Sequence, residues 1–137
     1  LRPAVEKHAL AGADSYEMEY HEAGSGLGAM IYVAYFAELL WDEKSGLRMA
    51  AHSLKGLAPA LFELDPDLDI LNVRYETTFV DKYGQESRHW YVSAQVSRET
   101  AENIVWENVL RCNFPDILDV WKVYAPLANA WQELCAE

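Results

Sequence analysis

Four carboxylates in the middle of the chain have a spacing that could hold a calcium ion. Positions 1, 3, 5 and 12 of a calcium-binding loop are filled here by Asp65, Asp67, Asp69 and Glu76. Position 6 of such a loop makes a sharp turn and requires glycine, but this chain has Ile70 there. We therefore interpret the segment as an acidic turn and expect no metal site in it.

The four histidines could supply acid–base chemistry, but their spacing matches no known catalytic pattern. They are His8, His21, His52 and His89. The sequence contains no H-E-x-x-H or H-x-H pair, no G-x-S-x-G nucleophile motif and no Cys–His signature. This favours a protein that is not an enzyme and has no cofactor. A site assembled from residues distant in the sequence stays open at this stage.

A glycine-rich segment contains the sharpest motif in the chain. Residues 22–28 read EAGSGLG, an E-x-G-x-G-x-G spacing formed by Glu22, Gly24, Gly26 and Gly28. This spacing resembles the nucleotide-binding loop of the Rossmann-like S-adenosylmethionine-dependent methyltransferases. The resemblance implies a cofactor site lined by these four residues, at a point where a strand turns into a helix. The alternative interpretation of the same residues is a flexible glycine loop.

Two alternating segments joined by a polar turn predict a long β-hairpin over residues 69–97. Residues 73–79 and 90–97 alternate apolar with polar side chains, which is typical of strands with one buried face. The turn between them contains Gly84, which suits a left-handed backbone position. Because the connection is too short for a crossover helix, the two strands must be antiparallel.

The polar side of this hairpin is the predicted partner-binding surface. The alternation places Trp90 on the buried face and Tyr91 on the outer face, and Tyr83 lies in the turn. Exposed aromatic side chains are typical of interfaces. We therefore expect a partner to contact Arg74, Glu76, Tyr83, Tyr91 and Gln95. The alternative is a solvated outer face, which is common in antiparallel sheets.

Two further segments precede the hairpin in the first third of the chain. Residues 16–22 alternate strictly and predict a short strand that could add an edge to the hairpin. Residues 29–41 are apolar nearly all round and predict a largely buried helix, with a strand over residues 31–35 as the alternative.

Helical patterns occupy both sides of the predicted hairpin. Residues 45–64 have one apolar stripe and predict a helix with Ser45 as its N-cap and a kink or restart at Pro59. Ser97 can cap a short helix over residues 98–103. Pro115 fits a first helical position, and a continuous apolar stripe follows it to the C-terminus. We therefore predict an α+β fold, an antiparallel sheet built on the hairpin at about 69–97 with helices before and after it packed on one face.

Composition limits the kinds of partner that this chain can bind. Its 137 residues include 22 acidic and 11 basic side chains, which give a formal net charge of −11. Such a chain is repelled by nucleic-acid phosphates and by anionic lipid, so we expect no nucleic-acid partner. The apolar run of residues 26–41 is shorter than the roughly 20 residues of a membrane-spanning helix, so we expect no membrane insertion. The length predicts a single domain over residues 1–137, in which residues 1–14 are a tail or a loosely docked helix.

The two cysteines, Cys112 and Cys135, could form a bridge between the last two helical segments or remain as buried thiols. We favour buried thiols, because free cysteine is among the most buried residue types. A bridge is the open alternative. The sequence indicates neither the compartment nor the oligomeric state.

Three functional hypotheses follow from these observations. The first is a non-enzymatic acidic protein-interaction module of the inhibitor, immunity or adaptor type, which engages a basic partner. The second is a small S-adenosylmethionine-dependent enzyme that uses the glycine loop of residues 22–28. The third is a small-ligand-binding cone formed between the sheet and the helices.

Overall fold

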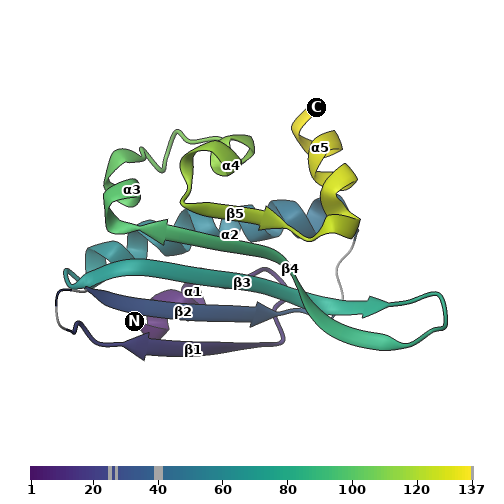
Figure 1. Cartoon of the computed structure of the whole chain (residues 1–137), viewed down its shortest axis with the longest axis horizontal. Coiled ribbons are helices and arrows are strands. Elements are labelled where there is room, and N and C mark those ends of the chain that lie inside the picture. The colour runs from purple at the N-terminus through teal and green to yellow at the C-terminus, as the bar shows by residue number, and fades with distance from the viewer. Residues whose placement is uncertain (25, 27, 39–41, 137) are drawn as a thin grey trace.

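The computed structural model describes residues 1–24, 26, 28–38 and 42–136 and shows a sheet with helices packed behind it (Figure 1). The elements in chain order are α1 (Arg2–Lys7), β1 (Ser15–His21), β2 (Ala29–Phe36), α2 (Glu43–Leu64), β3 (Leu68–Val80), β4 (Glu86–Ser97), α3 (Arg98–Asn103), η1 (Arg111–Asn113), α4 (Phe114–Ile117), β5 (Val120–Val123), η2 (Ala125–Leu127) and α5 (Ala128–Ala136). The predicted α+β class is confirmed.

The strands that the structure describes form one sheet in the order β1-β2-β3-β4-β5. Neighbouring strands are antiparallel except β2 and β3, which are parallel and are connected through α2. The sheet is therefore mixed rather than purely antiparallel, because the long connection through α2 lets the chain return in the same direction. The helices α3 and α5 and the turn η1 all contact α2. They therefore lie on the same side of the sheet as α2, as predicted.

The long hairpin is confirmed as β3 and β4, and its free end extends beyond the other strands (Figure 1). The turn is stabilised by the Asp81 carboxylate, which accepts hydrogen bonds from the backbone N–H groups of Tyr83 and Gln85 at 2.8 and 2.9 Å. Gly84 has a φ of 78°, the left-handed value predicted for it. The predicted strand near residues 16–22 is also confirmed as β1, although it pairs with β2 rather than with the hairpin.

The prediction of a buried helix over residues 29–41 is wrong for the part that the structure describes. Residues 29–36 form strand β2, which confirms the alternative of a strand over residues 31–35; residues 39–41 lie outside the described part of the chain. All eight residues of β2 are apolar or aromatic, so the strand has no period-two pattern. A short apolar run of this kind cannot be assigned from periodicity alone. Its conformation is decided by pairing with β1 on one side and β3 on the other.

Helix α2 covers one face of the sheet and begins earlier than predicted. Its N-cap is Asp42 rather than Ser45: the Asp42 carboxylate accepts a hydrogen bond from the Ser45 backbone N–H at 2.8 Å. The predicted kink or restart at Pro59 is not found, because Pro59 lies inside a single helix that continues to Leu64.

We call the side of the sheet that faces α1 and α2 the covered face and the opposite side the uncovered face. The covered face is a fully buried apolar core formed by Ile31, Val33, Tyr35, Leu71, Val73 and Tyr75 of the sheet with Leu47, Leu54, Leu57 and Leu61 of α2. Its buried hydroxyls are paired. The Tyr75 hydroxyl donates to Ser53 Oγ at 3.0 Å, and the Ser53 hydroxyl donates to the backbone carbonyl of His8 at 2.6 Å.

The N-terminal segment, expected as a tail or a loosely docked helix, packs on this core through α1. Val5 is fully buried, and its carbonyl accepts a hydrogen bond from the Tyr35 hydroxyl. Burial raises the pKa of Tyr35 well above its ordinary value, so this phenol remains a donor throughout the physiological range. Helix α1 therefore contributes to the covering layer.

The C-terminal region differs from the continuous helical stripe predicted after Pro115. Pro115 does lie in the first turn of α4, but this helix ends at Ile117, and Val120–Val123 form the edge strand β5. Strand β5 pairs with β4, which satisfies backbone groups that a helix would have paired internally. Helix α5 then starts at Ala128. At the end of β4, Ser97 caps α3 as predicted, accepting from the Thr100 N–H at 3.2 Å.

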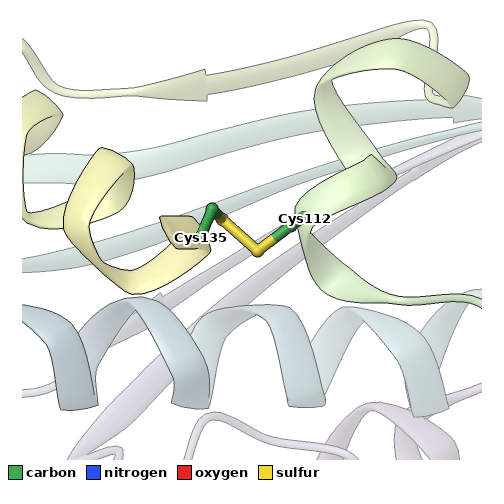
Figure 2. The surroundings of a disulfide bond; sticks show 2 residues. All are labelled: Cys112 and Cys135. Carbon is green, nitrogen blue, oxygen red and sulfur yellow. A yellow bond between two sulfur atoms is a disulfide. The ribbon is translucent and has the colours of Figure 1, made fainter. Parts of the chain in front are cut away.

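A disulfide joins Cys112 of η1 to Cys135 of α5, so the prediction of two buried thiols is wrong (Figure 2). The Cα atoms of the two cysteines are 5.6 Å apart. Both side chains are only partly buried, so the general burial of free cysteine did not apply here. The bridge closes the chain segment that contains α4, β5 and η2 and ties η1 to the last helix.

Candidate functional site

Strand β2 is apolar on both sides, but among the described residues the helices cover only one side of it. Ile31, Val33 and Tyr35 point to the covered face and are fully buried. Tyr32 and Phe36 alternate with them on the uncovered face, where they are half-buried, and Met30 retains 36% of its accessible surface. A strand with two apolar sides is typical of a sheet buried on both faces. The uncovered face is therefore the candidate functional site.

The strand register arranges the side chains of the uncovered face in rows. One row contains an aromatic ring with one acidic side chain on its β1 side and two amide side chains on its other side, and the next row contains a mixture of charges. In order from β1 toward β5, the rows are Glu19, Tyr32, Asn72 and Gln95; then Glu17, Ala34, Arg74, Ser93 and Lys122. A third row contains Phe36, Glu76 and Trp90. Across these rows the acids Glu17 and Glu19 lie on the β1 edge, and the bases Arg74 and Lys122 lie nearer β5.

One charged pair on the uncovered face is already compensated within the chain. Arg88 Nε donates to Glu76 Oε1 at 2.8 Å, and Arg88 Nη2 lies 2.7 Å from the same oxygen. The guanidinium also stacks on Phe36, with its Cζ atom 4.2 Å from the ring centroid. Glu76, Arg88 and Phe36 therefore form one preorganised unit in which neither charge needs an external partner.

Three of the five predicted partner-binding residues lie together on this face. Arg74, Glu76 and Gln95 are within the rows described above. Tyr83 lies apart from them at the hairpin tip, where it is 77% exposed and Lys82 Nζ is 5.2 Å from its ring centroid.

The prediction that Tyr91 is exposed on the outer face is wrong. Tyr91 is 0% exposed, and its hydroxyl donates to the backbone carbonyl of Gly46 in α2 at 3.3 Å. The cause is an irregularity in the pairing: Tyr75 pairs with Val92 but Glu76 pairs with Trp90, so Tyr91 is an extra residue. This bulge turns Tyr91 toward the helices and places Trp90 beside Glu76, opposite to the predicted arrangement.

The glycine segment does not have the strand–loop–helix context that its resemblance implies. It connects β1 to β2, two antiparallel strands, so no helix follows it. Glu22 and Gly24 are exposed, and Gly26 has a φ of 75°, which favours glycine in a turn. A Cβ on Gly28 would lie 2.5 Å from the Cβ of Asp69, so glycine is required there for close packing of the chain. Ser25 and Leu27 lie outside the described residues.

The glycine segment and the acidic turn, which are distant in the sequence, lie side by side at one end of the sheet. The Ala29 backbone N–H donates to the carbonyl of Asp67 at 2.9 Å. We call Glu22, Asp65, Asp67 and Asp69 the acidic end. Within the described part of the chain, no group of three or more His, Cys, Asp or Glu side chains is arranged to hold a metal ion.

The hydroxyl of Tyr20 in β1 contacts the acidic end, and this contact raises its pKa. Its hydroxyl donates to Asp65 Oδ2 at 2.7 Å. This hydrogen bond, together with desolvation and the nearby carboxylates of Asp65, Asp67 and Glu22, raises the pKa of Tyr20 to about 12. The four clustered carboxylates of the acidic end give it a negative potential.

Sequence reasoning missed the aromatic centre of the site. The sequence pattern predicts Tyr32 and Phe36 in a buried helix and Trp90 on the buried face of the hairpin, whereas the structure places all three on the uncovered face. The one available signal was the all-apolar run of β2, since a strand that is apolar on both faces needs cover on both. That signal becomes interpretable only when the segment is known to be a strand.

Comparison with protein-family models found no match for this chain. Comparisons with curated proteins and with solved structures found no significant similarity. Among the residues that the structure describes, no helix is long and apolar enough to cross a membrane.

Proposed function

We propose that the chain is a non-enzymatic acidic protein-interaction module of the inhibitor, immunity or adaptor type, which binds a basic protein through the uncovered face. The observation that carries this proposal is strand β2, in which both sides are apolar but only one has helical cover. A partner that buries Met30, Tyr32 and Phe36 completes the layer that the chain leaves open. Burial of aromatic anchors is the main source of affinity at many protein interfaces.

Charge favours a basic partner over a second copy of the same chain. Glu17 and Glu19 are exposed on β1, in the same rows as Ala34 and Tyr32, and the acidic end continues from that edge. The net charge of −11 makes two copies repel each other, whereas it accelerates the encounter with a basic protein. The partner is expected to place apolar groups on β2 and Lys or Arg side chains on β1.

The first test is affinity capture from the native source, followed by titration of the purified captured protein with three forms of the chain. The form with Glu17→Lys and Glu19→Lys reverses charge on the uncovered face. The matched control, with Glu63→Lys and Asp116→Lys, makes the same change in net charge at exposed positions on the helical side. We expect the first pair to weaken binding at least tenfold more than the control pair.

The aromatic centre is tested in the same titration with Tyr32→Ala. Loss of a central aromatic anchor is expected to weaken binding by about 2 kcal/mol, or roughly thirtyfold. Leu110→Ala, at an exposed apolar residue on the helical side, is the control, and it should leave affinity within about threefold. Unchanged affinity in both the Tyr32 variant and the Glu17/Glu19 variant contradicts the proposal. A concentration-dependent dimer of the chain alone, abolished by Tyr32→Ala, would instead identify a second copy as the occupant.

A further inference from the structure

A second surface feature lies on the helical side, away from the uncovered face. A cleft of about 710 Å³ is formed between the end of α1, the middle of α2 and the loop after α3. Its lining includes Lys7, His8, His52, Lys55, Trp106 and Glu107. The volume is in the range of clefts that bind small molecules.

The charge of this cleft is opposite to that of the chain as a whole. The chain has twice as many acidic as basic residues, but the lining contains two lysines against one carboxylate, Glu107. Two of the four histidines in the sequence are also in it. Glu63 lies in an adjoining cleft that shares Lys7 and His8. At physiological ionic strength charges are screened over about 8 Å, so a ligand in the cleft is attracted mainly by the nearby cations.

The protonated form of the His8 imidazole is disfavoured when no ligand is bound. Desolvation, followed by the charges of Lys7 and His52, lowers the pKa of His8. An anion bound among these groups would relieve their repulsion and favour the protonated form of the imidazole. Lys55 Nζ donates to the backbone carbonyl of Val109 at 3.0 Å, which uses one of its three N–H groups and leaves two for a ligand.

The walls of the cleft are fixed by the core of the protein. The backbone carbonyl of His8 accepts from the Ser53 hydroxyl, which in turn accepts from the buried hydroxyl of Tyr75. A Cβ on Gly56 would lie 2.4 Å from His8 Nδ1, so glycine at this position lets the imidazole lie directly against α2. The indole of Trp106 is held by a hydrogen bond from Nε1 to the carbonyl of Ala101 at 3.2 Å. A flat apolar wall therefore adjoins the cationic groups.

We propose that this cleft binds a small organic anion, with a phosphate or carboxylate group placed among Lys7, His8, His52 and Lys55 and a flat apolar body against Trp106. This site is independent of the proposed protein-binding face, since it lies on the other side of the sheet. Its occupant is a small molecule rather than a protein.

Phenyl phosphate is the probe for the first experiment, monitored by NMR of the imidazole C–H groups at pH 7. His8 and His52 line the cleft, whereas His21 and His89 lie elsewhere and act as internal controls. We expect saturable shifts of His8 and His52 only. Benzylamine, a cation of similar shape, should cause no shift. Benzoate and inorganic phosphate then distinguish a carboxylate preference from a phosphate preference and show the contribution of the apolar body.

Variants provide the second readout. Lys7→Gln should weaken phenyl phosphate binding about tenfold, since it removes a charge-assisted contact, while Lys82→Gln at the hairpin tip should have no effect. Affinity for benzoate, whose charge is constant over this range, should also fall as the pH rises from 5.5 to 8, because the His8 imidazole loses the proton that a bound anion favours. Equal shifts in all four histidines, or no shift of His8 and His52 at 10 mM probe, would overturn the proposal. No protein partner is present in this assay. A negative result would therefore overturn the anion site without affecting the proposal of a protein-binding face.

Discussion

The two faces of strand β2 differ in cover more than in composition. On β2 the side chains of both faces are apolar, but those toward α1 and α2 are fully buried, while Met30, Tyr32 and Phe36 retain access to solvent. The covered face is the core that stabilises the fold. The uncovered face buries less apolar surface and contributes less to stability. Side-chain type alone therefore does not distinguish the covered from the uncovered face on β2; the position of the helices does.

Matched isoleucine substitutions on the two faces should give the largest difference in stability. Ile31 is fully buried on the covered face, whereas Ile70 is half-buried on the uncovered face of the neighbouring strand. Ile31→Ala should reduce the free energy of unfolding by about 2–5 kcal/mol through lost burial and a residual cavity. Ile70→Ala should cost about 1 kcal/mol. Urea denaturation measures both, and equal losses would contradict the distinction between the faces.

The disulfide joins two segments on the helical side of the sheet, η1 and α5. Replacing Cys112 and Cys135 by serine should lower the free energy of unfolding by roughly 3 kcal/mol, because the bridge restricts the unfolded chain across a sequence separation of 23 residues. Denaturation of the wild type with and without reductant checks the same quantity. A reductant effect that persists in the double serine variant would show that it does not arise from this bridge.

The smallest effect is expected at Tyr20, where the acidic end adjoins the sheet. Its pKa is raised from 10.0 to about 12, so the Tyr20–Asp65 interaction stabilises the folded state fully below pH 10 and is lost as the pH rises toward 12. Site-specific NMR of the Tyr20 ring carbon measures this titration directly. Asp65→Asn should shift the titration back toward 10, and a Tyr20 pKa unaffected by that change would exclude the hydrogen bond as its main cause.

Much of the framework could be predicted from local patterns. The alternation in residues 69–97 specified the hairpin, Gly84 specified its turn, and Ser97 specified the start of α3. Each of these features depends on neighbours within a few residues, through backbone conformation or capping. Of the candidate site, the same alternation correctly placed Arg74, Glu76 and Gln95 on one face.

Features that depend on contacts between distant residues could not be predicted from local sequence patterns. The bulge that buries Tyr91 is a property of the pairing between β3 and β4, and one extra residue reverses the side to which a strand residue points. The bridge between Cys112 and Cys135 depends on how η1 and α5 are placed relative to each other. The cationic cleft combines residues from three segments that are far apart in the sequence.

By itself, the sequence determined the α+β class, the long hairpin, the helix that ends at Leu64 and the acidic character of the chain. Only the tertiary structure decided that residues 29–36 are a strand, because an all-apolar segment fits a helix or a strand equally well until its neighbours provide hydrogen bonds. The tertiary structure also decided which apolar face is core. Burial depends on where the helices pack, and they cover one side of β2 and leave Tyr32 and Phe36 on the other.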